Sequence, residues 1–255
     1  MKIELVSTDF DGTLVGFEPE QSSPVEFLEW VVLFQLSGGI WMINTGRWID
    51  SMVERIRALN IVPKPQFLGC GEREIYELVG DTYLPVEPWN SECDRIHEKL
   101  RREFHQAFLE IRRYLEKNTH ALILDEKEVF SGCMASSLEE ADAISQYLEG
   151  LFKKYPEISV ARNDVYFRFC HRNYHKGACL DYVRRKFAIS TQRTFAAGDH
   201  YNDLPMLDMS IAGMLACPSN AVAAVKKKVS ECGGFVASLP YTAGIVQAIR
   251  NFTGE

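Results

Sequence analysis

Short apolar runs alternate with stretches of helical spacing in the first third of the chain. The runs are rich in β-branched and other apolar residues, which is typical of buried strands. The stretches between them place apolar residues three or four positions apart, as amphipathic helices do. We expect strands over residues 3–9, 40–44 and 66–68, helices over 24–36 and 49–59, and a hairpin over 72–84. This alternation predicts a parallel sheet with helices on its faces.

The pattern changes in the middle of the chain. A long charged helix is followed by two strands, a second helix and two further strands, an α+β module of αββαββ order. The expected helices cover residues 91–118 and about 138–155, and the expected strands cover 120–125, 129–135, 158–162 and 165–170.

The alternation of strands and helices returns at Lys176. We expect strands over 194–198, 211–215 and 234–237, with helices over 176–187, around Met206, from about Asn220, and at the end of the chain as far as Phe252. The fold class is therefore expected to be α/β. A doubly wound, parallel, Rossmann-like core of residues 1–84 and 171–255 would be interrupted by an inserted module of residues 85–170.

Composition is that of an ordinary globular protein. Of 255 residues, 46% are apolar and 25% charged, and the formal net charge is −7. This acidic balance argues against a general nucleic-acid or membrane partner, although a local basic pocket could still take an anion. The 7 cysteines form no repeating pattern, and the N-terminus carries no signal-peptide pattern, so we expect a cytoplasmic protein with reduced thiols.

Two carboxylates follow the first expected strand in the stretch "DFDGT". Asp9 and Asp11 stand one residue apart, where like charges repel and raise a pKa. Either these acids are solvated and idle, or a positive group belongs between them.

Other polar groups follow neighbouring strands. In an open α/β sheet the ligand crevice lies at the carboxyl ends of the strands. The groups expected there are Thr45, Gly46 and Arg47 after one strand, Asp199, Asn202 and Asp203 after another, and Lys176 at the start of a helix. Aspartates also cap helices and fill turns, so each one alone would mean little. Their occurrence together and in order favours a catalytic site.

The stretches "DFDGT", "NTGR", "HKG" and "GDHYND" resemble the four motifs of the haloacid dehalogenase superfamily. The inserted module resembles that superfamily's C2-type cap. It is similar to the caps of sucrose-phosphate, trehalose-phosphate and related sugar-phosphate phosphatases, and of Cof-type hydrolases. The resemblance covers nearly the whole chain and points to superfamily and reaction more than to substrate.

The charges of such a site imply a metal ion. Four carboxylates carry about −4 when ionised, and a phosphate monoester adds roughly −1.5 to −2. Lys176 supplies only one positive charge, so a divalent cation is needed to offset the rest. Mg²⁺ fits, because it prefers oxygen ligands shared between carboxylates and phosphates.

The resemblance implies a role for each motif residue. Asp9 would attack phosphorus, and Asp11 would protonate the leaving oxygen and then deprotonate the hydrolytic water. The implied catalytic residues are Asp9, Asp11, Thr45 and Lys176. The implied metal ligands are Asp9, the main-chain carbonyl of Asp11, and Asp199. Gly46, Arg47 and Asn202 would bind phosphate or substrate, and Asp203 would be a supporting residue.

We therefore expect a Mg²⁺-dependent phosphatase acting on a small phosphorylated molecule, with sugar phosphates first. A phosphomutase acting on a hexose phosphate is the alternative enzyme, although "NTGR" argues against it. A non-catalytic sugar-phosphate sensor is a third possibility. The substrate, the oligomeric state and the roles of His171 and His175 stay open at this point.

Overall fold

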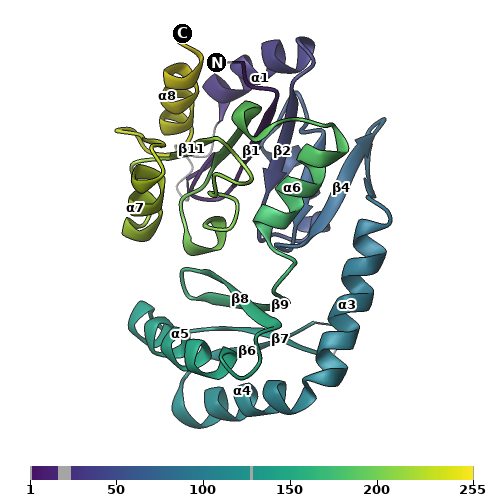
Figure 1. Ribbon diagram of the computed structural model, residues 1–255, viewed down its shortest axis with the longest axis vertical. Coiled ribbons are helices and arrows are strands. Elements are labelled where there is room, and N and C mark those ends of the chain that lie inside the picture. The colour runs from purple at the N-terminus through teal and green to yellow at the C-terminus, as the bar shows by residue number, and fades with distance from the viewer. Residues whose placement is uncertain (1, 17–23, 127–128, 255) are drawn as a thin grey trace. The chain divides into compact units, whose positions relative to one another are not determined.

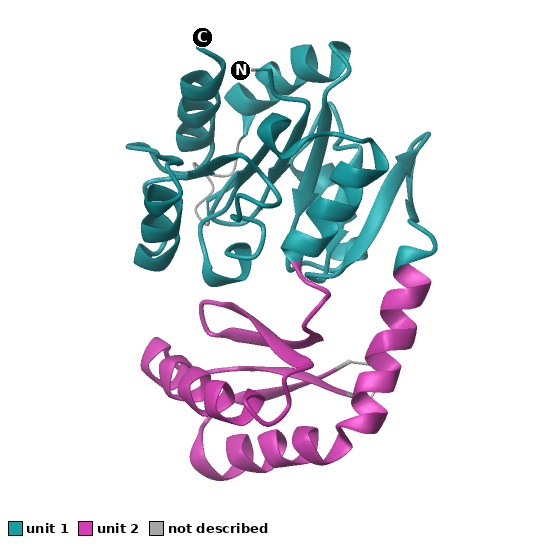
Figure 2. Ribbon diagram, viewed as in Figure 1, with its two compact units in different colours: residues 1–89, 176–255 teal, residues 90–175 magenta. Residues whose placement is uncertain are grey.

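The computed structural model describes residues 2–16, 24–126 and 129–254, which form two compact units (Figures 1 and 2). The core unit combines Met1–Trp89 with Lys176–Glu255, and the inserted unit is Asn90–His175. Each boundary lies five residues later than the sequence suggested. The chain thus leaves the core unit once and returns to it once.

The core unit is built on an eight-stranded sheet of order β12-β11-β10-β1-β2-β3-β4-β5. Its strands are β1 (Leu5–Thr8), β2 (Ile40–Asn44), β3 (Phe67–Cys70), β4 (Glu74–Val79), β5 (Thr82–Pro85), β10 (Thr194–Ala197), β11 (Met214–Cys217) and β12 (Phe235–Val236). The strands from β12 to β3 run parallel, and the hairpin β4–β5 continues the sheet in antiparallel fashion. The expected α/β fold with a mostly parallel sheet is confirmed.

Helices cover both faces of this sheet. They are α1 (Val25–Leu36), α2 (Ile49–Ala58), α6 (Lys176–Lys186), α7 (Ala223–Glu231) and α8 (Tyr241–Thr253). Leu5 and Val6 are both fully buried, on opposite faces of β1. Val6 packs in the apolar cluster of α1, α2 and α8, and Leu5 in that of α6 and α7. Two buried faces explain why the central strands are mostly apolar.

The inserted unit has a four-stranded antiparallel sheet of order β6-β7-β9-β8. Its elements are α3 (Trp89–Glu103), α4 (His105–Asn118), β6 (Leu122–Glu126), β7 (Val129–Met134), α5 (Leu138–Phe152), β8 (Ile158–Asn163) and β9 (Tyr166–His171). Helices α4 and α5 pack on one face of the sheet through a single apolar cluster. Within the described ranges, no helix combines the length and apolar character needed to cross a bilayer.

The single long helix expected over residues 91–118 is wrong, because the chain forms two helices that meet at Phe104. Figure 1 shows that α3 and α4 run in different directions. Phe104 leaves helical geometry, with φ −106° and ψ 25°, and packs against the cluster that holds Leu100 and Phe108. The buried positions keep helical spacing across the break, and neither Gly nor Pro stands there. Tertiary packing therefore overrides local propensity.

The fully described segment 200–213 lacks the helix expected around Met206. It contains a short 3-10 helix at Tyr201–Asp203, followed by turns. The Asp208 carboxylate accepts a hydrogen bond from the backbone two residues on, and such local bonds compete with helix formation. The strand that follows begins three residues later than expected, at Met214.

Candidate active site

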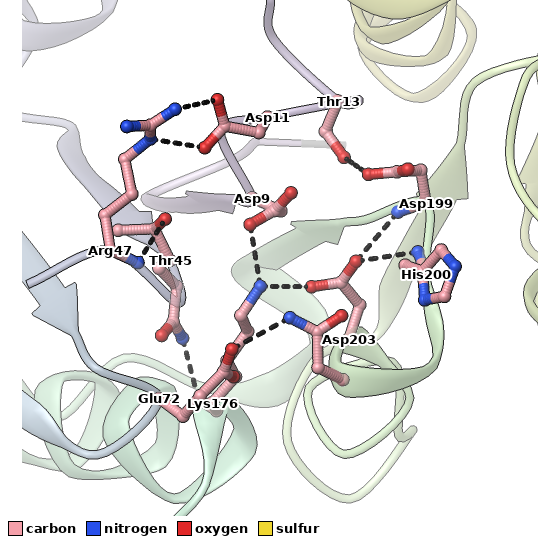
Figure 3. A network of polar contacts seen from close by, with 12 residues as sticks. Asp9, Asp11, Thr13, Thr45, Arg47, Glu72, Lys176, Asp199, His200 and Asp203 are labelled. Atoms are coloured by element: carbon pink, nitrogen blue, oxygen red, sulfur yellow. Dashed lines mark hydrogen bonds and ion pairs between the residues drawn. The ribbon is translucent and has the colours of Figure 1, made fainter. Parts of the chain in front are cut away.

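The candidate site lies at the carboxyl ends of central strands of the core unit, and Figure 3 shows its side chains. Asp9 follows β1, Thr45 follows β2, and Asp199 comes two residues after β10. Because β1 pairs in parallel with both neighbours, these three strand ends lie side by side. The Asp9 N–H donates to the Ala197 carbonyl at 2.9 Å, which continues this pairing up to the first carboxylate. The sheet thereby gathers polar groups from distant parts of the chain at one edge.

Lys176 is the central cation of this group and is fully buried. Its Nζ donates to Asp9 Oδ1 at 2.6 Å and to Asp203 Oδ1 at 2.7 Å (Figure 3). Burial favours the neutral amine, but Asp203, Asp9 and Glu72 outweigh it and raise the pKa of Lys176 well above its usual value. The lysine therefore carries its charge throughout the physiological pH range.

Asp203 anchors the loop that carries Asp199. Besides Lys176, it accepts hydrogen bonds at Oδ2 from the backbone N–H groups of Asp199 and His200, both at 2.9 Å. Gly198 makes room for it, since a Cβ there would lie 2.4 Å from the Asp203 Cβ. Both carboxylate oxygens of Asp203 are thus engaged in holding protein groups.

The carboxylates of Asp9 and Asp199 are crowded. With Asp203, they place oxygens within 4.8 Å of one another. Burial, followed by the repulsion of neighbouring carboxylates, raises the pKa of Asp9 well above its usual value and that of Asp199 to about 7, although Lys176 opposes both shifts. A hard divalent cation would offset this charge, so the donor set fits Mg²⁺. Because Asp203 is engaged, Asp9 and Asp199 carry the oxygens available to it.

Gly12 and Thr13 shape the wall around Asp199. Thr13 Oγ1 donates to Asp199 Oδ1 at 2.7 Å. Gly12 has φ +86°, and a Cβ there would lie 2.4 Å from Asp199 Oδ2. Glycine is thus required both by the backbone conformation and by the close approach of the carboxylate.

Asp11 stands apart from the carboxylate cluster and is paired with Arg47. Arg47 Nε donates to Asp11 Oδ2 at 2.6 Å, and Nη2 donates to Oδ1 at 2.8 Å (Figure 3). The hydrogen bond with Asp11 is the main reason that the pKa of Arg47 is raised. Both side chains are partly exposed, at 23% for Asp11 and 36% for Arg47. The guanidinium that was expected to bind phosphate or substrate thus holds the expected acid–base residue.

Thr45 and Gly46 form the short loop after β2. Thr45 is buried, and its Oγ1 accepts a hydrogen bond from the Arg47 N–H at 3.1 Å. Gly46 passes close to Glu72, since a Cβ on Gly46 would lie 2.7 Å from Glu72 Oε1. A bulkier residue at position 46 would displace that carboxylate.

Glu72 is a member of this network that the sequence analysis missed. It follows β3, so it stands at the same edge of the sheet, and this position was the one signal available. It is 4% exposed, and its Oε1 accepts a hydrogen bond from Asn202 Nδ2 at 2.9 Å. Asn202, expected to bind phosphate, is itself buried and turned toward this carboxylate.

His171 and His175 lie in the inserted unit. The His171 N–H donates to Nε2 of the buried His97 at 3.1 Å. Burial lowers the pKa of both His171 and His175. His171 is thereby tied into the packing of the inserted unit.

Known proteins resemble this chain along almost its full length. A family model described as sucrose-6F-phosphate phosphohydrolase matches residues 2–253. The solved sucrose-phosphatase from Synechocystis sp. PCC6803, in complex with sucrose and phosphate, superposes with a TM-score of 0.77 at 18% identity and 99% coverage of both chains. A haloacid dehalogenase-like hydrolase from Bacillus subtilis gives 0.64 at 18% identity, covering 100% of this chain and 94% of that one.

A shorter match joins the chain to a curated protein. It is 31% identical over 70 residues to a putative phosphatase from Haemophilus influenzae, and this stretch spans 27% of each chain. The match of the family model, by contrast, covers nearly every residue and agrees with the motifs. The expected resemblance is confirmed: the chain belongs to the sucrose-6F-phosphate phosphohydrolase family of haloacid dehalogenase-like proteins, and it is a phosphoric monoester hydrolase.

Proposed function

We propose that this hydrolase is Mg²⁺-dependent, forms an aspartyl phosphate on Asp9, and acts on a small sugar phosphate. The observation that carries the proposal is the buried Lys176, held between Asp9 and Asp203 beside the crowded Asp199 carboxylate. Such a cluster has too little positive charge for a phosphate ester unless a cation joins it. It therefore fits phosphoryl transfer with metal assistance.

Asp9 would be the nucleophile. Lys176 donates to its Oδ1, which leaves Oδ2 to attack phosphorus while the first oxygen stays oriented. A bond forms between this oxygen and phosphorus, and the bond from phosphorus to the sugar oxygen breaks. Water then attacks the phosphorus, the bond to Asp9 breaks, and inorganic phosphate leaves. The charge of Lys176 and the Thr45 hydroxyl would stabilise the transferred group.

Asp11 would supply the leaving oxygen with a proton and later take one from the hydrolytic water. While Arg47 donates to both of its oxygens, both oxygens of Asp11 are occupied as hydrogen-bond acceptors and neither is available to the leaving group. The pair must therefore open before the leaving group departs. Arg47, once released, would be free to bind the phosphorylated substrate.

The metal ion would be held by the carboxylates of Asp9 and Asp199 and by the main-chain carbonyl of Asp11. When bound, Mg²⁺ would offset the charge of the carboxylates and polarise the phosphoryl group. Asp203 would act indirectly, by holding Lys176 and the backbone of the Asp199 loop.

Two findings favour a sugar phosphate as substrate. The matching family is described by its action on sucrose 6F-phosphate, and a structural neighbour was solved with sucrose and phosphate. We propose that the inserted unit, Asn90–His175, serves as a C2-type cap that selects the leaving group. The core residues alone recognise only the phosphate.

A panel of phosphate esters tests the proposal. Sucrose 6F-phosphate, fructose 6-phosphate, glucose 6-phosphate and p-nitrophenyl phosphate would be incubated with and without Mg²⁺, and released phosphate measured. We expect release from at least one sugar phosphate, arrest by EDTA, and radiolabel on the protein after acid quenching with a ³²P-labelled substrate. Conversion of one hexose phosphate into another without phosphate release would instead indicate a mutase. No turnover of any ester would refute the proposal.

A further inference from the structure

Glu72 occupies a position where neither its backbone conformation nor its charge is expected. Its φ is +72°, in the left-handed region that residues with a Cβ rarely adopt. It stands in the turn between β3 and β4, where a charged side chain normally reaches solvent, yet it is 4% exposed. Strained conformations persist where the surrounding structure requires them, and they cluster at functional sites.

The contacts of Glu72 explain what the surrounding structure holds in place. Its N–H donates to the Thr45 carbonyl at 3.2 Å, and its Oε1 lies against Gly46. The same oxygen accepts a hydrogen bond from Asn202 Nδ2 at 2.9 Å. Oε2 is buried and has no hydrogen-bond partner among the described residues. Glu72 thus joins the loop after β2 to the loop that carries Asn202.

The chemistry of the pair decides the orientation of Asn202. Glu72 Oε1 accepts from Nδ2, so the amide turns its N–H toward Glu72. The opposite end, Oδ1, is then fixed on the far side as an acceptor, and it is buried without a partner in the described structure. The second proton on Nδ2 is likewise held in one direction. A reversed amide would set its oxygen against the carboxylate.

We propose that Glu72 is a positioning residue, which acts by fixing the amide of Asn202 for phosphoryl transfer. The inference rests on the proposed function, because it assigns Asn202 to the same reaction. It does not require Glu72 to touch substrate. It explains why a residue with a Cβ stands at a left-handed position that glycine would occupy more easily.

Four variants and one control test this assignment. Glu72→Gly removes the carboxylate and relieves the backbone, whereas Glu72→Gln keeps an oxygen that can accept from Asn202. Asn202→Ala removes the amide, and the variant that carries both Glu72→Gly and Asn202→Ala completes a double-mutant cycle. Ala188→Gly is the matched control, because Ala188 also has a positive φ, of 53°, and is exposed. Mg²⁺-dependent hydrolysis of p-nitrophenyl phosphate and thermal melting would be measured for each.

We expect Glu72→Gly to lower kcat at least tenfold while KM changes less than threefold, since an orienting contact acts mainly in the transition state. Glu72→Gln should recover part of this loss, and the double variant should be no slower than Asn202→Ala. Ala188→Gly should keep the parent's kcat. If the kcat losses of Glu72→Gly and Asn202→Ala multiply in the double variant, the assignment of Glu72 is wrong. The same follows if Glu72→Gly is as fast as the parent, and neither result touches the proposed function. A parent that hydrolyses no ester would overturn the proposed function as well.

Discussion

Lowering the pH should weaken Mg²⁺ binding, because the ion must displace a proton from the carboxylate pair. The pKa of Asp199 is raised to about 7, against 3.8 for an ordinary aspartate, mainly by burial. At pH 5 such a group is about 99% protonated, so the apparent affinity should fall about 100-fold, or ~2.7 kcal/mol. The raised pKa of Asp9 would steepen the dependence toward two protons.

The raised pKa of Asp199 also sets the direction in which the stability of the metal-free protein changes with pH. A carboxyl whose folded-state pKa is raised binds its proton more tightly when folded, so its contribution is present at low pH. It is lost as pH rises from about 3.8 to about 7, where Asp199 ionises in its buried place. Bound Mg²⁺ should remove most of this loss, so the rise in melting temperature on adding MgCl₂ should be larger at pH 8 than at pH 5.5.

Isothermal titration of MgCl₂ at pH 5, 6, 7 and 8 and constant ionic strength would measure the effect. We expect the affinity to fall by at least tenfold per pH unit below pH 7, because Asp9 as well as Asp199 takes up a proton there. Asp199→Asn should bind weakly and with a shallower pH dependence. An equal Kd at pH 5.5 and pH 8 would show that the carboxylates are not the ligands that the geometry indicates.

Three further predictions concern single side chains. Asp9→Asn should abolish steady-state hydrolysis while the melting curve is retained, and turnover within tenfold of the parent would contradict nucleophilic catalysis. Arg47→Ala should lower sugar-phosphate turnover by about tenfold, because the guanidinium that would bind the phosphorylated substrate after the pair opens is lost. Its melting temperature should stay within about 3 °C, since a partly exposed ion pair contributes ~0–1 kcal/mol; a larger drop in melting temperature would mark the pair as structural. Arg168 alternates along β9 with the buried Phe167 and so lies on the face away from the apolar cluster. Arg168→Gln should reduce turnover of the sugar phosphate much more than that of p-nitrophenyl phosphate, and equal losses would argue against selection by this face.

The sequence could predict the core fold because its signals are local and repeated. The parallel strands are mostly apolar, as burial on both faces requires, and the central strand ends carry polar residues in a fixed order. The topology then brings Asp9 and Asp199 together by strand pairing alone. Neither side chain needs a long-range contact to be recognised as part of one site.

The parts that escaped prediction depend on packing between distant residues. The break at Phe104 leaves the hydrophobic spacing unchanged, so only the apolar cluster reveals it. The pairing of Arg47 with Asp11 joins two motifs that the sequence assigned to separate tasks. Glu72 resembles an ordinary charged turn residue, and its burial becomes visible only when Asn202 is placed beside it.

The interrupted core has a consequence for how the protein is made. β1 must pair with β10, where Leu5 lies opposite Thr194, 189 positions later in the chain (194 minus 5). At about 5–20 residues per second, a ribosome needs roughly 10–40 s to supply that partner. During this interval the edge of β1 has no parallel neighbour on one side, whereas the inserted unit contains all four strands of its own sheet. A nascent chain halted before residue 194 should therefore carry a folded insert on an unfinished core, and the exposed β1 edge is where chaperones should bind it.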